Sequence, residues 1–247
     1  MKILAVYAIK GGVGKTAAAV NLAYEAAQSG ARVALWDLDP QGASTFYFRV
    51  KAKVRGGGAK LVYGESDLLD HVKATDYENL DIIPSDFSYR NLDINLDEMQ
   101  RPTYQLKRIL KSLEDEYDYV ILDCPPGITL LSENVMRAAD ALLVPVIPTT
   151  LSVLTLEQLQ DFKDRSRLPK LKILPFLSMV DRRRAMQRDV SAGFYRKNKG
   201  ALKAMVPSCT SVERMGLERA PVQTFAGNSE GAKAFNQLWK QVAKKVG

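Results

Sequence analysis

Short apolar runs alternate along the chain with longer segments in which apolar residues recur every three or four positions. Continuous apolar runs of this length are typical of strands that are covered on both faces. They predict strands at Ile3–Ile9, Val33–Asp37, Leu80–Ile83, Tyr119–Asp123, Ala141–Val146 and Ile173–Val180. The periodic segments predict helices at Lys15–Ser29, Tyr104–Glu116, Glu133–Ala138, Thr155–Arg165, Ala185–Arg196 and Ala232–Lys245.

This alternation indicates an α/β fold, a doubly wound and mainly parallel sheet with helices on both faces. No long Pro, Gly or Ser-rich linker divides the 247 residues, so we predict a single domain spanning residues 1–247. In such a fold ligands bind beyond the carboxyl ends of the strands. The loops that follow the predicted strands are therefore where chemistry is expected.

The loop after the first predicted strand has the composition of a phosphate-binding loop. It contains Lys10, Gly11, Gly12, Val13, Gly14, Lys15 and Thr16, and the next helix begins within it. Glycines let backbone N–H groups point inward, the helix adds its positive end, and a lysine supplies a point charge for the β- and γ-phosphates. The Thr16 hydroxyl is placed for Mg²⁺. The usual first glycine of this motif is replaced by Ile9, and Lys10 follows it.

Carboxylates follow two further predicted strands. Asp37 and Asp39 lie at the end of Val33–Asp37, and a buried strand ends at Asp123. A strand-terminal acid downstream of a phosphate loop is expected to hold Mg²⁺ through water. A carboxylate on a loop beside the γ-phosphate can orient the attacking water.

The segment Lys10–Thr16 resembles the ParA/MinD family of P-loop ATPases, whose motif is K-G-G-x-G-K-[ST]. The resemblance extends through Asp37–Thr45, which is similar to that family's first switch, and Asp123–Gly127, which is similar to its second. It implies ATP and Mg²⁺ as cofactors, slow ATP hydrolysis and a homodimer closed over ATP. It makes Lys10 a residue that acts on the partner's nucleotide, with Lys15, and places Asp39 at the water and Asp37 near the metal.

Two departures from the family pattern concern the same regions. Ala17 stands where relatives carry Thr or Ser, which removes a hydroxyl from the α-phosphate but leaves the backbone donor. Ala43 stands where relatives carry Asn. The resemblance also places the adenine between two late segments, with contacts from Met179, Pro207, Ser208 and Cys209. No guanine-type N-K-x-D motif occurs, which favours ATP over GTP.

Charge is unevenly distributed. Residues 1–150 carry 16 Lys and Arg against 20 Asp and Glu, whereas residues 151–247 carry 19 against 8. A basic C-terminal part indicates a polyanionic partner. Clustered cations bind DNA phosphates without reading bases, and ParA-type relatives bind nucleoid DNA in this way. We predict DNA contacts from Arg196, Lys197, Lys199 and Lys203; Arg182 and Arg183 are alternatives for the nucleotide pocket.

The remaining features concern the cellular location of the protein and its contact with membranes. Cys124 and Cys209 fit a reducing compartment, and the apolar run after Met1 is too short for a secretory signal, so we expect a cytoplasmic, nucleoid-associated protein. His71, the only histidine, lies in a polar acidic segment and is expected at the surface. The last predicted helix carries an apolar stripe that either packs on the sheet or contacts a membrane; we expect no stable membrane insertion.

The function expected is therefore an ATP-dependent switch that positions or segregates a DNA or protein cargo, with hydrolysis stimulated by a ParB-like or cargo adaptor protein. Two alternatives remain open. One is an ATP-dependent synthetase of the related biotin and cobyrinate branches. The other is a membrane-bound regulator of the division site.

Overall fold

Eight strands form one sheet in the computed structural model, which describes residues 1–181 and 183–247. Their order is β3-β4-β2-β5-β1-β6-β7-β8, and only the β3 and β4 pair is antiparallel. The strands are β1 (Lys2–Val6), β2 (Val33–Asp37), β3 (Lys73–Ala74), β4 (Leu80–Ile83), β5 (Tyr119–Asp123), β6 (Ala141–Val146), β7 (Lys172–Val180) and β8 (Met205–Pro207). This sheet confirms the predicted fold class.

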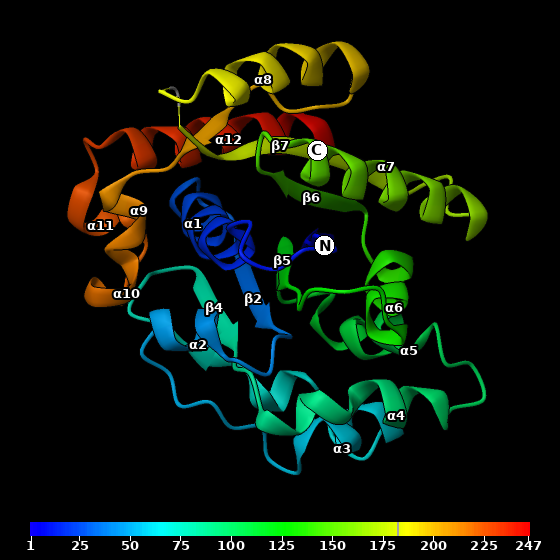
Figure 1. Ribbon diagram of the computed structural model, residues 1–247. Helices are drawn as coiled ribbons and strands as arrows, with labels where there is room; N and C mark the ends of the chain where they lie inside the picture. The colour runs from blue at the N-terminus through cyan, green and yellow to red at the C-terminus, as the bar shows by residue number, and fades with distance from the viewer. Residues whose placement is uncertain (182) are drawn as a thin grey trace.

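Helices connect the parallel strands and cover both faces of the sheet (Figure 1). The longer ones are α1 (Lys15–Gln28), α6 (Leu130–Ala138), α7 (Thr150–Arg165), α8 (Ala185–Lys197) and α12 (Glu230–Val246). The short ones are α2 (Ala43–Tyr47), α3 (Gly57–Tyr63), α4 (Leu92–Asp97), α5 (Gln105–Ile109), α9 (Thr210–Glu213), α10 (Met215–Glu218) and α11 (Val222–Ala226). Single 3₁₀ turns occupy Leu69–His71, Phe87–Asn91 and Leu110–Leu113.

The central strand β1 shows why its sequence is apolar without a break. Leu4 and Val6 belong to the core formed with α1 and α12, whereas Ala5 and Tyr7 belong to the core on the opposite face. All four residues are fully buried. Burial of both faces removes the alternation of polar and apolar residues that a half-exposed strand would show.

Most predicted elements are confirmed, and the differences lie at their ends. The helix predicted from Thr155 begins at Thr150, where the Thr149 side chain accepts a hydrogen bond from the Ser152 N–H. The exposed Leu151 and Leu154 hide the helical period of this first turn. The helix predicted over 104–116 is split into α5 and a 3₁₀ turn.

The expectation that His71 lies at the surface is wrong. Its side chain is buried, and one ring nitrogen, Nε2, lies 2.6 Å from the Ser66 hydroxyl. His71 ends a 3₁₀ turn just before the edge strand β3. Its neighbour Asp70 is exposed, because a 3₁₀ turn places each successive side chain about a third of a turn further round.

The apolar stripe of α12 faces the protein interior. Phe235, Leu238, Trp239, Val242 and Val246 are all buried in the core shared with α1. The Trp239 indole N–H also donates to the Ser29 hydroxyl at 3.3 Å. Of the two interpretations of this stripe, packing on the body of the protein is the one the fold supports.

Candidate nucleotide site

The loop between β1 and α1 adopts a conformation that requires glycine. Gly12 and Gly14 have φ angles of 69° and 90°, in the left-handed region that side chains disfavour. A Cβ at Gly14 would lie 2.9 Å from the Ser178 Oγ, so the end of β7 also presses against the loop. The N-terminus of α1 thus opens into a loop that is held close to β7.

Lys15 lies over this loop. Its ammonium donates a hydrogen bond to the Lys10 carbonyl oxygen at 3.2 Å, and its side chain is buried. Burial lowers the pKa of Lys15, whereas the nearby Asp123 acts in the opposite direction. A desolvated lysine at a helix N-terminus is a strong site for a phosphate, because an anion would replace the water that the ammonium has lost.

Two carboxylates meet where β2 and β5 end. Asp37 is the register partner of Asp123, and both side chains are fully buried. The Oδ2 of Asp37 accepts hydrogen bonds from the Thr45 N–H at 2.8 Å and the Thr45 hydroxyl at 2.7 Å. The Oδ2 of Asp123 accepts one from the Ser44 hydroxyl at 2.7 Å.

The second oxygen of each carboxylate has no partner. Both Oδ1 atoms are buried without a hydrogen bond among the described residues. Burial raises the pKa of both groups; the negative charge of Asp37 raises the pKa of Asp123 further, and the charge of Asp39 raises both. Hydrogen bonds from Ser44 and Thr16 to Asp123 oppose it. Paired buried carboxylates with free oxygens fit a hard divalent cation such as Mg²⁺, which would favour their ionised forms.

Sequence reasoning missed the hydroxyls that hold these acids. Ser44 and Thr45 begin α2, and the Thr45 hydroxyl also accepts a hydrogen bond from the Ser85 N–H at 2.8 Å. The only signal in the sequence is a Ser-Thr pair shortly after Asp39. Its role could not be inferred, because the hydroxyls reach acids from two different strands.

Asp39 lies two residues beyond β2 and is half-buried. Its Oδ1 accepts a hydrogen bond from the Gln41 N–H at 3.0 Å. Its carbonyl oxygen accepts one from the Ser85 hydroxyl at 2.6 Å. These bonds fix the loop that carries Asp39 beside the buried acids, and its role at the attacking water stays a prediction.

The loop after β5 is tied to β1. The Gly127 N–H donates to the Ile9 carbonyl at 3.0 Å, and the Tyr7 hydroxyl donates to the Gly127 carbonyl at 2.6 Å. Gly127 has a φ angle of 101°, which favours glycine. Tyr7 was not anticipated, because its apolar neighbours predict only a core position. It links the two loops that would contact a γ-phosphate.

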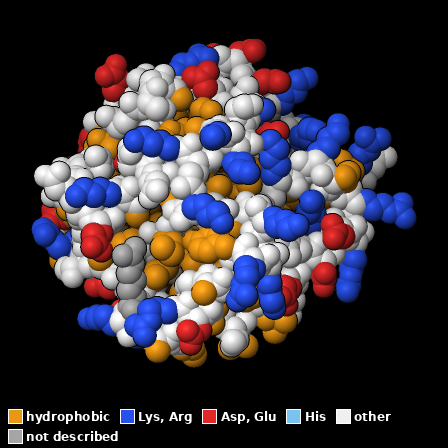
Figure 2. All heavy atoms as spheres, turned by 90° about the horizontal axis from the view of Figure 1, so that it is seen from above, with side chains coloured by type: hydrophobic (Ala, Val, Ile, Leu, Met, Phe, Trp, Pro, Cys, Tyr) orange, Lys and Arg blue, Asp and Glu red, His pale blue; other side chains and the backbone are white. Residues whose placement is uncertain are grey.

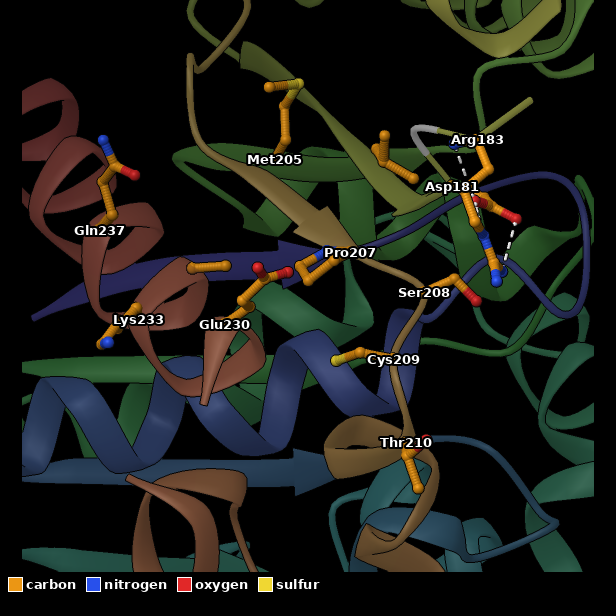
Figure 3. Close-up of a pocket in the computed structure, with 12 residues that line it drawn as sticks. Asp181, Arg183, Met205, Pro207, Ser208, Cys209, Thr210, Glu230, Lys233 and Gln237 are labelled. Carbon is orange, nitrogen blue, oxygen red and sulfur yellow. Dashed lines mark hydrogen bonds and ion pairs between the residues drawn. The ribbon is translucent and has the colours of Figure 1, made fainter. Parts of the chain in front are cut away.

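A cavity of about 600 Å³ lies between β7, β8 and the start of α12 (Figure 3). Pro207, Ser208 and Cys209 line it. Met179 is not among its lining residues; it has a φ angle of 53° and an exposed side chain. The individual contacts to adenine remain predictions.

The opposite walls of this cavity were not foreseen. Glu230, Lys233 and Gln237 line it from one side of α12 (Figure 3). Arg183 also lines it, and its guanidinium contacts Asp181 with Nε at 2.9 Å from Oδ1 and Nη2 at 3.0 Å from Oδ2. These bonds lower the pKa of Asp181 to about 2. Arg182, the other alternative for the pocket, lies outside the described residues.

The four residues expected at DNA lie together. Arg196 and Lys197 end α8, Lys199 follows it, and Lys203 precedes β8; all four are exposed. The Lys203 ammonium lies 4.4 Å from the centre of the Tyr195 ring. None of the four pairs with an acid among the described residues. Seen from above, Lys and Arg side chains surround an apolar patch on this part of the surface (Figure 2).

Fold and site together define a P-loop nucleoside triphosphatase. A family model described as "AAA domain" matches residues 1–172. The sporulation initiation inhibitor protein Soj of Bacillus subtilis is 32% identical over 98% of each chain. The chromosome partitioning protein ParA of Caulobacter vibrioides is 32% identical over 99% of this chain and 95% of its own. The chain therefore belongs to the ParA/MinD family of P-loop ATPases, as its sequence predicted.

Solved structures agree with this assignment. Cobyrinic acid a,c-diamide synthase from Mycobacterium smegmatis, with ADP and magnesium, superposes with a TM-score of 0.82 at 26% identity, covering 99% of this chain and 94% of its own. MinD from Pyrococcus horikoshii, with Mg-ADP, superposes with a TM-score of 0.79 at 24% identity, covering 100% of this chain and 97% of its own. Both neighbours hold magnesium, as predicted here, together with ADP, the product of ATP hydrolysis.

No helix within residues 1–181 and 183–247 combines the length and apolar character that a membrane span requires.

Proposed function

We propose that this protein is an ATP-driven switch that closes into a homodimer over Mg-ATP, binds DNA without sequence preference as that dimer, and hydrolyses ATP slowly to position or segregate a DNA or protein cargo. A ParB-like or cargo adaptor protein stimulates hydrolysis and so releases the dimer from DNA. The cycle runs in the cytoplasm, on the nucleoid.

The proposal rests on the exposed apolar side chains that lie beyond the carboxyl ends of the strands. Large apolar side chains are exposed in the loops and helices that follow β5, β6 and β7: Ile128 is 48% exposed, Leu151 62% and Met186 59%. Exposed apolar groups gathered at one edge mark an interaction surface. Lys10 lies at the same edge, and its ammonium has no partner among the described residues.

The nucleotide part of the cycle follows from the site. Lys15 and the N-terminus of α1 hold the phosphates, and Asp123, Asp37 and Thr16 hold Mg²⁺ through its water shell. Asp39 orients the attacking water. Lys10 of one subunit reaches the partner's triphosphate and neutralises the charge that develops during hydrolysis.

The DNA part of the cycle follows from unpaired charge. One subunit offers Arg196, Lys197, Lys199 and Lys203 as a small basic patch, which would bind phosphates weakly by counterion release. A rigid dimer carries two such patches, and the second binds at the effective concentration set by the first. ATP thereby controls DNA affinity through dimerisation.

Light scattering on the Asp39→Ala variant tests the dimer. We expect a monomer with ADP and a dimer with ATP, because hydrolysis no longer removes the ligand that closes the interface. The matched variant Asp39→Ala with Leu151→Glu places a charge on the apolar edge and should remain monomeric with ATP. A monomer in Asp39→Ala itself at saturating ATP would exclude the switch.

DNA retention tests the second half and separates the alternatives. We expect binding with ATP, not with ADP, and loss of binding between 50 and about 200 mM salt. The variant Arg196→Glu with Lys197→Glu should lose binding, whereas Lys107→Glu, an exposed cation on α5, should not. DNA binding that ignores the nucleotide would defeat the switch, whereas ATP turnover that needs a small acid substrate and no partner protein would favour the synthetase alternative.

A further inference from the structure

Another cleft, of about 540 Å³, is lined by residues that were not assigned to the nucleotide site. It is formed by the segment that joins α2 to α3 and by the edge strand β3. In Figure 1 this segment lies at the opposite end of the molecule from α8. The charged and titratable residues that line it are Lys51, Lys53, Arg55, Asp70, His71 and Lys73.

The four basic side chains of this cleft lack a direct acidic partner among the described residues. The side chains of Lys51, Lys53, Arg55 and Lys73 form no ion pair or hydrogen bond among the described residues. Among the described residues, Asp70 is the one acid that lines the same cleft, and Asp86, outside the lining, interacts electrostatically with Lys53. Four like charges gathered in one concavity repel one another, and the concave shape focuses their field. An anion that entered would relieve the repulsion.

The cleft is held in shape by the chain around it. Val54, between Lys53 and Arg55, is buried, and its N–H donates to the Asp86 carboxylate at 2.8 Å. The Val50 N–H donates to the Thr45 carbonyl at 3.2 Å. The basic side chains therefore project from a backbone that is anchored at both ends, which limits the entropy lost when a ligand binds.

His71 lies at the buried floor of the cleft. Burial lowers the pKa of His71; the nearby Asp70 raises it, Lys73 and Arg55 lower it, and Asp67 raises it. Both cations are thus close enough to act on one ring.

Acidic residues around the cleft favour a small ligand over a long polyanion. Residues 1–150 carry four more acids than bases, and Asp67, Asp76 and Glu78 are exposed in the chain on either side of the edge strand β3. A long polyanion laid across this region would meet those carboxylates. A small ligand that fits inside about 540 Å³ would not, and this volume is in the range of small-molecule pockets.

From this geometry we infer a second binding site, for a compact ligand that carries two or more linked phosphates, held by Lys51, Lys53, Arg55 and Lys73. The site goes beyond the proposed switch and does not depend on it. Inorganic polyphosphate and nucleoside polyphosphates share the required chemistry.

Calorimetry on the Lys15→Ala variant without Mg²⁺ tests the site, because this background removes the phosphate loop as a competitor. Inorganic tripolyphosphate is the probe. We expect binding in Lys15→Ala and at least a tenfold loss when Lys53→Glu and Arg55→Glu are added. Adding Lys107→Glu instead changes the net charge in the same sense outside the cleft and should leave the affinity within twofold.

Three further arms complete the test. ATP binding equal to tripolyphosphate in Lys15→Ala would show that the phosphate chain suffices; tighter binding of ATP would show that a nucleoside is also recognised. Slowed hydrogen exchange at residues 50–55 and 73 on adding tripolyphosphate locates the site even if the charge reversals unfold the protein. No binding to Lys15→Ala, no change in exchange at these residues, or tighter cleft-dependent binding of duplex DNA would overturn the inference.

Discussion

Asp37 and Asp123 are register partners on neighbouring parallel strands, and each keeps one buried carboxylate oxygen without a hydrogen bond among the described residues. Burial raises the pKa of both acids, and the charge of Asp37 raises the pKa of Asp123 further. The arrangement costs the metal-free protein stability, and a bound divalent cation would recover it.

Asp123→Asn should therefore stabilise the metal-free protein while ending its response to metal. Removing one charge relieves the repulsion. We expect the free energy of unfolding to rise by about 1 kcal/mol, which raises the melting temperature by roughly 2–4 °C for a chain of this size. Thermal unfolding with EDTA and with Mg-ADP measures both effects. Mg-ADP should raise the melting temperature of the wild type far more than that of the variant. Equal increases would mean that Asp123 does not hold the metal.

Lys10→Ala should separate nucleotide binding from assembly. The Lys10 carbonyl, which accepts the bond from Lys15, is unchanged by the substitution, so ATP binding should stay within about threefold. Dimerisation and hydrolysis should be lost, because the positive charge that Lys10 places on the partner's phosphates is missing. Lys15→Ala is the contrast, since it should abolish nucleotide binding itself. Normal hydrolysis in Lys10→Ala would refute the role across the interface.

Asp39→Ala should keep ATP and the dimer while hydrolysis falls by about 10²-fold or more. The Ser85 and Gly42 bonds to the Asp39 carbonyl do not involve the side chain, so the loop should keep its shape. Single-turnover hydrolysis of bound ATP gives the rate directly. Asp39→Asn is the control for size, and it should be as slow as Asp39→Ala.

Glu25→Gln should change how stability depends on pH. Glu25 is buried on α1, its Oε2 accepts a bond from the Asn236 amide at 2.6 Å, and its Oε1 has no partner among the described residues. Burial raises the pKa of Glu25, while Asn236 and Lys240 oppose the rise. The folded state therefore favours the protonated acid.

The sign follows from that preference. A carboxyl whose folded pKa is raised contributes stability below its unfolded pKa, and the contribution is lost as pH rises through the folded value. Glutamine mimics the protonated form at every pH, so Glu25→Gln should gain stability over the wild type at pH 8 compared with pH 5. Thermal unfolding at the two values measures this. A difference that is the same at both values would mean that Glu25 does not titrate in this range.

Local features of the sequence predicted the phosphate loop and most of the elements. The order of strand, glycine-rich loop, Lys15 and Thr16 is contiguous, and short-range sterics and helix formation alone specify its shape. The doubly buried strands were equally visible, because β1, β2 and β5 carry unbroken apolar runs. The assignment of residues 1–247 to one domain and of individual adenine and DNA contacts remain predictions.

The tertiary structure decided whatever depends on residues that are distant in the chain. The pairing of Asp37 with Asp123, the hydroxyls of Ser44 and Thr45 on those acids, and the cleft that joins Lys53 to Lys73 arise only when separate segments meet. Burial of His71 depended on a 3₁₀ turn that its acidic neighbours hid. The sequence pattern indicates which residues prefer water and which prefer a helix. Strand register and packing determine which charges face each other, and both depend on the whole chain.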